Sequence, residues 1–188
     1  MLDFTGVKAI TIPEGKVKKI TRKSDGAFIW ERKGFTNLVP LSTEADGKTI
    51  YNGGKGYKDK YRIRSSGAEV GMDEGTCTGY IQYTKSDKLY IYPPFTGGNT
   101  QNAINFYDGS FACIGQVTDS GGGYGICAGY ASLFKTQVVN GVSVLDLSAV
   151  TISGVENIAF VRVTNDRYAC ENRSGSDMII TKNEEITL

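Results

Sequence analysis

Two short patterns in the chain match catalytic motifs, and each lacks the partners that its chemistry requires. Ser132 and Lys135 have the Ser-x-x-Lys spacing in which a lysine one helical turn away activates a serine nucleophile, but no Ser-Asp-Asn or Lys-Thr-Gly motif accompanies them. Residues 123–128, GYGICA, have the glycine spacing of a dinucleotide-binding turn without the βαβ setting that places a pyrophosphate. We interpret the first as a chance match and the second as a surface loop.

The remaining reactive side chains also argue against catalysis. The chain has no histidine, which removes the usual general base and the Ser-His-Asp and Cys-His nucleophile pairs. The adjacent acids Asp73-Glu74 and Glu184-Glu185 point to opposite faces of an extended chain, so neither pair can flank one scissile bond. We therefore predict a protein that is not an enzyme, with no catalytic residue and no cofactor.

The cysteines predict neither a metal site nor a redox motif. All four lie far apart in the sequence with no Cys-x-x-Cys pair. Small buried thiols are the interpretation that we favour over disulfides, and the sequence leaves the choice open for each of them: Cys77, Cys113, Cys127 and Cys170.

A ligand-binding role is the functional interpretation that the residue types allow. Flat tyrosine rings stack on sugar faces, while amides and carboxylates hydrogen-bond to hydroxyl groups. Tyrosine is also simply a common strand residue, which is the competing explanation. The residues of these types that we expect at loop tips are Tyr51, Asn52, Tyr57, Tyr92, Asn99, Asn102, Tyr107, Asp108 and Tyr124.

Composition narrows the classes of partner. Among 188 residues, 21 Lys and Arg oppose 20 Asp and Glu, and a net charge of +1 provides no field that would gather nucleic acid. No segment approaches the roughly 20 apolar residues of a membrane span. The N-terminus has neither the basic leader nor the apolar core of a secretory signal. We expect a soluble protein that inserts into no membrane.

Residues 76–117 contain the clearest strand pattern, because apolar residues recur at every second position between polar turns. On this basis Cys77, Ile81 and Tyr83 share one face, and Lys85-Ser86-Asp87 joins two strands as a hairpin. Asn105 and Tyr107 point outward, and residues 93–102 form an exposed loop with Tyr107 and Asp108 nearby. The side chains that we expect to be buried between two sheets are Ile81, Leu89, Ile91, Ile104 and Phe106.

The rest of the chain continues this pattern, with turn signals every 8 to 12 residues and no long helical period. The fold class predicted is all-β, a two-sheet antiparallel β-sandwich of jelly-roll type. Residues 119–129 form a loop that leads into a short helix at 130–135. Further strands or extended runs are expected at 35–42, 61–64, 138–147, 150–152, 158–164 and 178–181.

The N-terminal residues 7–31 divide at two turn signals, Pro13-Glu14-Gly15 and Ser24-Asp25-Gly26, into a small three-stranded β-meander. Too few apolar residues are present to hold a core alone. We place the domain boundary in the charged linker 31–34, so that residues 1–33 form an attachment segment and residues 34–188 the sandwich.

Three runs carry a resemblance to a known family. They are 78–81 with 88–91 (TGYI, KLYI), 103–108 (AINFYD) and 157–163 (NIAFVRV). Together they resemble the jelly-roll domains of tail, baseplate and tail-fibre proteins of phages and prophages of gut Firmicutes, and residues 7–31 resemble the β-rich lead segment of such proteins.

This resemblance implies a non-enzymatic structural protein of the virion, assembled in the bacterial cytoplasm with other tail or baseplate proteins and as a homo-oligomer such as a trimer. It also implies a module similar to carbohydrate-binding modules that contacts glycans of the host cell surface. Two alternatives stay open: a free-standing carbohydrate-binding module of a bacterial surface or prophage-encoded protein, and a glycan-cleaving enzyme. The only Trp, Trp30, lies outside the expected sandwich, and no Asp cluster indicates a calcium site.

Overall fold

The computed structural model describes residues 19–21, 28–31, 35–45, 56–95, 102–171 and 173–186. The chain divides into two compact units, Met1–Phe35 and Thr36–Leu188. In the first unit, β1 (Lys19–Thr21) pairs antiparallel with β2 (Phe28–Glu31). These match the second and third strands of the expected meander, and the first, at residues 7–12, lies outside the described residues.

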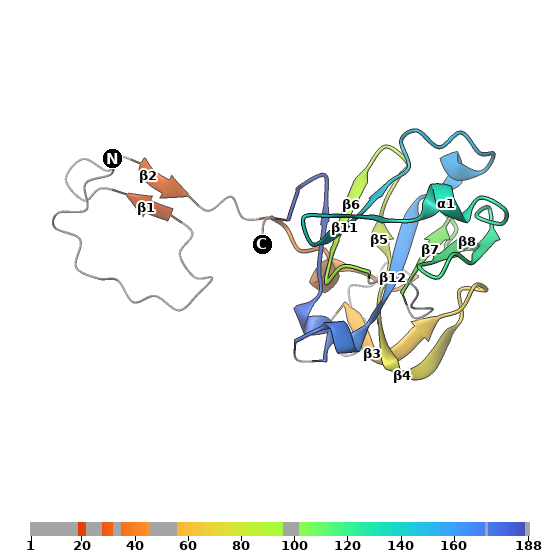
Figure 1. Ribbon diagram of the computed structural model, residues 1–188, viewed down its shortest axis with the longest axis horizontal. Helices are drawn as coiled ribbons and strands as arrows, with labels where there is room; N and C mark the ends of the chain where they lie inside the picture. Colours follow the sequence, from red (N-terminus) through yellow and green to blue (C-terminus); the bar gives the residue numbers. More distant parts are fainter. Residues whose placement is uncertain are drawn as a thin grey trace. The chain divides into compact units, whose positions relative to one another are not determined.

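The second unit is built from two antiparallel sheets (Figure 1). The four-stranded sheet has the order β10 (Gln137–Val139), β11 (Val142–Asp146), β6 (Lys88–Tyr92) and β13 (Ile179–Lys182). The seven-stranded sheet has the order β3 (Tyr57–Ile63), β4 (Glu69–Thr78), β12 (Phe160–Asp166), β7 (Ala103–Tyr107), β8 (Cys113–Thr118) and β9 (Gly123–Gly125), while β5 (Ile81–Gln82) also pairs with β12. The predicted all-β, two-sheet sandwich is confirmed.

Helical structure is limited to single turns in the described part of the chain. They are α1 (Ala131–Phe134) and four 3-10 turns: η1 (Val39–Leu41), η2 (Val155–Asn157), η3 (Arg167–Ala169) and η4 (Gly175–Asp177). The expected short helix near residues 130–135 is therefore confirmed.

Both sheets contribute side chains to one hydrophobic core. In β6, Leu89 and Ile91 are buried and Tyr90 between them is half-buried, as the period-two alternation predicts. The five residues that we expected in the core are all buried there: Ile81, Leu89, Ile91, Ile104 and Phe106. Each such side chain stabilises the fold by about 1.5–3 kcal/mol relative to an exposed position.

The turn at residues 84–87 connects the two sheets and is not the hairpin that we predicted. Its geometry is that of a tight turn, since the N–H of Asp87 donates to the carbonyl of Thr84. The strand before it, β5, pairs with β12, whereas the strand after it, β6, pairs with β11 and β13. Turn chemistry specifies the local reversal but not the sheet that each flanking strand joins.

The expectation that Cys77 shares a face with Ile81 and Tyr83 is also wrong. The ladder is interrupted at Gly79 and Tyr80, between β4 and β5. Cys77 consequently packs against Ile63 in a small second cluster, while Ile81 and Tyr83 belong to the main core.

Three further differences concern short elements. The run 138–147 forms two strands, because Asn140 and Gly141 both have positive φ and make a tight hairpin turn. The run 150–152 forms no strand, and the segment 35–42 contains the 3-10 turn η1. The expected loop 119–129 includes β9, which pairs with β8.

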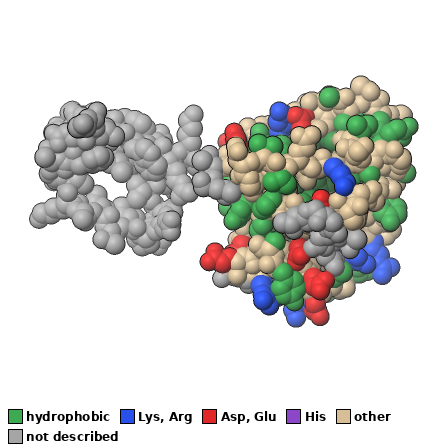
Figure 2. Space-filling model, viewed as in Figure 1, with side chains coloured by type: hydrophobic (Ala, Val, Ile, Leu, Met, Phe, Trp, Pro, Cys, Tyr) green, Lys and Arg blue, Asp and Glu red, His purple; other side chains and the backbone are tan. Residues whose placement is uncertain are grey.

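The outer face of the seven-stranded sheet is partly covered by the β3–β4 hairpin. Ile63, near the tip of this hairpin, donates its N–H to the Thr164 hydroxyl of β12 and accepts from the Gln116 amide of β8. Asn105 and Tyr107 were predicted to point outward, and both are buried, because the hairpin lies over the strand that carries them. The visible surface of the larger unit carries acidic and basic side chains side by side (Figure 2).

Candidate functional site

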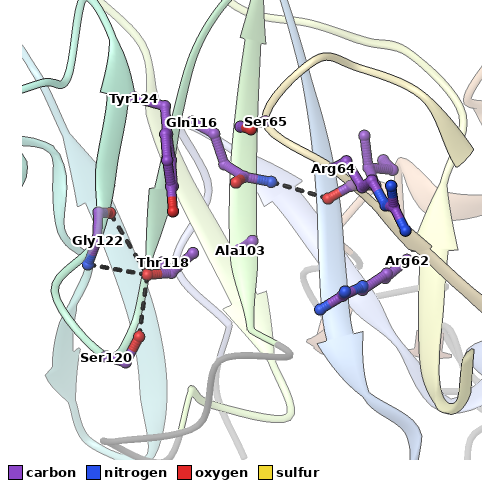
Figure 3. Close-up of a pocket in the computed structure, with 10 residues that line it drawn as sticks. Arg62, Arg64, Ser65, Ala103, Gln116, Thr118, Ser120, Gly122 and Tyr124 are labelled. Atoms are coloured by element: carbon purple, nitrogen blue, oxygen red, sulfur yellow. Dashed lines mark hydrogen bonds between the residues drawn. The ribbon is translucent and has the colours of Figure 1, made fainter. Parts of the chain in front are cut away.

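A polar groove of about 280 Å³ opens where the β3–β4 hairpin and the β8–β9 hairpin face each other (Figure 3). The end of β3 and the turn after it form one wall, and β8 with β9 forms the other. Ala103 and Gln116 lie between the walls, on β7 and β8. The residues that line this groove are Arg62, Ile63, Arg64, Ser65, Ala103, Gln116, Thr118, Ser120, Gly122 and Tyr124.

The β3 wall is held by side-chain amides of the sheet beneath it. The Gln116 amide donates to the Ile63 carbonyl (2.8 Å) and to Asn105 Oδ1 (2.9 Å). The Asn105 amide donates in turn to the Arg64 carbonyl (2.8 Å). The two Gln116 bonds are buried and the Asn105 bond is partly buried, so competition with water is limited and the wall has a defined position.

The bend that brings β3 over the sheet is specified locally. The β3–β4 register shifts between Asp59 and Tyr61, and Lys60 at this bulge has φ +65°. A bulge of this kind bends its strand and increases the local twist. Opposite it, a Cβ on Gly75 would lie 2.6 Å from the Tyr61 carbonyl oxygen, so the close approach of the two strands requires glycine.

The opposite wall presents Tyr124 from β9. Tyr124 is the cross-strand partner of Gln116, and its side chain is 51% exposed. The turn below it is closed by Thr118, whose hydroxyl accepts from the Gly122 N–H (2.9 Å) and lies 3.1 Å from the Ser120 hydroxyl. The groove therefore combines an accessible aromatic ring with hydroxyl groups on one wall.

The charge of the groove comes from Arg62 and Arg64. Among the described residues, neither arginine has an acidic side chain within ion-pair distance, and none of the lining residues is acidic. The nearby Arg162, by contrast, is 4% exposed and pairs with Glu69 (2.6 Å), which also pairs with Lys58 (2.9 Å). This hydrogen bond with Glu69 raises the pKa of Lys58. The groove is thus a site of net positive charge.

No protein-family model, curated protein or solved structure matches this chain. A function for the groove therefore has to be inferred from its own residues.

The structure places one of the nine sequence-predicted site residues, Tyr124, in the groove. Tyr51, Asn52 and Asn99 lie outside the described residues. Tyr57 and Asn102 are buried, and Asn102 accepts from the Asp166 N–H (2.9 Å).

The expectation that Tyr107 and Asp108 form an exposed end holds only in part. Tyr107 is 1% exposed, so its predicted exposure is wrong, and burial raises the pKa of its phenol. Asp108 is half-buried in the β7–β8 turn, where hydrogen bonds lower its pKa, chiefly one from the Ser110 side chain and secondly one from the Ala112 N–H. Tyr92 is half-buried in β6. Of the expected loop 93–102, Pro93, Phe95 and Asn102 are buried, and residues 96–101 lie outside the described part.

Sequence reasoning missed the two arginines of the groove. Residues 61–64 alternate in type, which by strand periodicity puts Tyr61 and Ile63 on one face and the arginines on the other, and Tyr61 and Ile63 do pack in the cluster around Cys77. That pattern says which residues share a face, but not that this face meets β9. The signal that was available is two arginines at i and i+2 without an acid between them.

The motifs that we set aside gain no catalytic support. Lys135 Nζ donates to the Asp119 carbonyl (2.7 Å), which engages the amine that would have to activate Ser132. None of the four cysteines forms a disulfide, in agreement with the interpretation that we favoured, and three of them are buried. Within the described ranges, no group of three His, Cys, Asp or Glu side chains is placed to hold a metal ion. Nor does any helix there have the length and apolar character needed to cross a bilayer.

Proposed function

We propose that this chain is a non-enzymatic component of a phage tail or baseplate, with an adhesin-like module that recognises carbohydrate on the host cell surface. The observation that carries the carbohydrate part is the groove, in which an exposed Tyr124 ring lies with hydrogen-bonding groups and two arginines that pair with no described acid. The tail or baseplate part rests on the family resemblance of the sequence runs, and the sandwich fold is compatible with it.

The geometry of the groove suits a sugar. The apolar face of a pyranose packs against an aromatic ring, and an exposed tyrosine loses little conformational freedom on binding because it has few rotatable bonds. The amide N–H groups of Gln116 donate to groups of the protein, and its oxygen lies on the side that faces away from β3 (Figure 3). That oxygen and the Ser120 hydroxyl are placed to hydrogen-bond with sugar hydroxyls.

The same lining favours binding over hydrolysis. Glycoside hydrolysis requires two carboxyl groups separated by about 5–10 Å across the scissile bond. Among the described residues that line the groove, none is Asp or Glu. A glycan held here would meet no described general acid or nucleophile.

A glycan array probed with the full chain tests this function, followed by titration of any hit by isothermal calorimetry. We expect binding that Tyr124→Ala weakens about two- to tenfold, which corresponds to the roughly 0.5–1.5 kcal/mol of one aromatic contact. Tyr168→Ala is the matched control, because Tyr168 is also 51% exposed but does not line the groove. Equal losses in the two variants, or no binding to any glycan at millimolar concentration, would contradict the proposal.

The tail or baseplate role makes a separate prediction about assembly. A tail component should form a defined oligomer, such as a trimer, or should bind another tail protein, whereas a free-standing carbohydrate-binding module should be a monomer. Size-exclusion chromatography with light scattering distinguishes these cases. A monomer that binds glycan and no tail protein would support the free-standing module instead.

A further inference from the structure

Arg62 in β3 and Arg64 just after it both line the groove, and no described acidic side chain lies within ion-pair distance of either one. Because both side chains line one groove, their like charges repel each other. Two other cations of this region are ion-paired, since Arg162 and Lys58 share the carboxylate of Glu69. An unneutralised pair that lines a groove is a site for an anion.

From this arrangement we infer that the groove binds a saccharide carrying a negatively charged substituent, namely a carboxylate, phosphate or sulfate. The sugar ring packs on Tyr124, and the charged substituent lies between Arg62 and Arg64 on the opposite wall. This inference rests on the proposed carbohydrate-binding function and specifies the chemical class of the glycan.

The size and orientation of the groove agree with such a ligand. Its volume of about 280 Å³ lies just under the ~300–1,000 Å³ typical of small-molecule sites, which leaves room for one or two sugar rings. In Figure 3 the Arg62 side chain extends from β3 toward the wall that carries Thr118 and Tyr124. A ligand that spans the groove therefore meets the ring at one end and the guanidinium group at the other.

Arginine is suited to this role because its planar guanidinium presents paired N–H donors that match two oxygens of a carboxylate or phosphate. The carbonyls of Ile63 and Arg64 are fixed by Gln116 and Asn105, so the backbone that carries both arginines is positioned before the ligand arrives. Positioning in advance lowers the entropy cost of binding.

A polyanion such as nucleic acid fits these observations less well. The chain has a net charge of +1, and a nucleic-acid surface needs many basic residues spread along a phosphate backbone. The groove offers two arginines and a single exposed ring, which matches one charged group on one sugar.

The test compares pairs of saccharides that differ only in the charged group. The pairs are galactose and galacturonate oligomers of equal length, galactose and galactose 6-sulfate, and glucose and glucose 6-phosphate. Affinities are measured for the full chain by calorimetry or saturation-transfer NMR at two salt concentrations. We expect at least one charged member to bind about five- to tenfold more tightly than its neutral partner, with the preference shrinking as salt rises.

The double variant Arg62→Gln/Arg64→Gln should weaken binding of the charged member more than binding of its neutral partner, so that the preference is lost. Arg173→Gln is the matched control, since Arg173 is an exposed arginine that stacks on Tyr168 and does not line the groove. Circular dichroism melting of each variant confirms that it is folded. The salt dependence of the unmodified chain provides a second readout that needs no variant.

The possible outcomes separate the inference from the function on which it rests. Equal binding of the charged and neutral members overturns the inference but leaves carbohydrate binding intact. Absence of binding to every saccharide overturns both. Tighter binding of a short single-stranded oligonucleotide than of any charged saccharide also overturns the inference.

Discussion

Replacement of Arg162 by leucine should destabilise the larger unit by about 3 kcal/mol. The Arg162 side chain is 4% exposed, and its Nε donates to the Thr78 carbonyl (2.8 Å) while its Nη2 donates to Glu69 (2.6 Å). The substitution leaves a buried carbonyl without this donor, which costs about 1–3 kcal/mol, and removes a charge-assisted bond worth about 1.5–3 kcal/mol. Glu69 is 24% exposed and keeps Lys58, so the total falls at the lower end of their sum.

Urea unfolding followed by far-UV circular dichroism measures this loss. Circular dichroism is preferable to tryptophan fluorescence because the single Trp, Trp30, belongs to the smaller unit. The expected loss corresponds to a decrease in Tm of roughly 6–12 °C for a domain of this size. Arg173→Leu, at an exposed position, should change the stability by less than about 0.5 kcal/mol.

A double-mutant cycle with Glu69→Gln isolates the ion pair. We expect a coupling energy of about 1–2 kcal/mol, because the two groups are in direct contact and mostly shielded from solvent. A loss of less than about 1 kcal/mol for Arg162→Leu, or a coupling near zero, would refute the view that this pair anchors the β3–β4 hairpin to the sheet.

Three further predictions concern the fold. Gly75→Ala should destabilise the protein by about 1–3 kcal/mol, because the added Cβ would meet the Tyr61 carbonyl. Gly71→Ala in the same strand has open space around it and should have little effect, so equal losses of stability in urea unfolding would argue against the close approach of β3 and β4 at Gly75. Hydrogen bonds from Ser148 and, to a smaller extent, from Lys88 lower the pKa of Asp146 from 3.8 to about 2. The contribution of the Asp146 carboxylate to stability is therefore present above about pH 4 and is lost as the pH falls through about 2. The stability difference between the unmodified chain and Asp146→Asn should therefore narrow over this interval in acid titrations, and a constant difference would contradict the assignment. Burial raises the pKa of Cys127 to about 12, so we expect this thiol to resist a thiol reagent at about pH 8 until the protein is unfolded, and rapid labelling of the native protein, mapped by mass spectrometry, would show that it is accessible.

Local patterns in the sequence predicted the fold where one face of a strand meets the core. Leu89 and Ile91 alternate with Lys88, Tyr90 and Tyr92, and this alternation alone predicts that the two aliphatic side chains face the interior. The Asn140-Gly141 dipeptide is a strong hairpin signal, and it could have separated β10 from β11. The residues around 85–87 gave the turn correctly but carried no information on which sheet each neighbouring strand would join.

The candidate site was less predictable because it depends on how the hairpin folds over the sheet. Tyr107 has the alternation of an outward residue, and it is buried because the β3–β4 hairpin at Gly67 and the Tyr80 ring pack against its ring. Arg62 and Tyr124 lie 62 positions apart in the sequence, and no periodic pattern links them. Tyr124 was identified by residue type, whereas the arginines become candidates only when the opposite wall is known.

The amide contacts that fix the groove wall also protect an edge of the sheet. β3 is the last strand on its side, and an open edge strand offers its backbone groups to strands of other chains. At Ile63 the outward N–H and carbonyl are occupied by Thr164 and Gln116. This end of β3 therefore cannot template the addition of a foreign strand, and the chain gains resistance to edge-to-edge aggregation beside the groove that its arginines line.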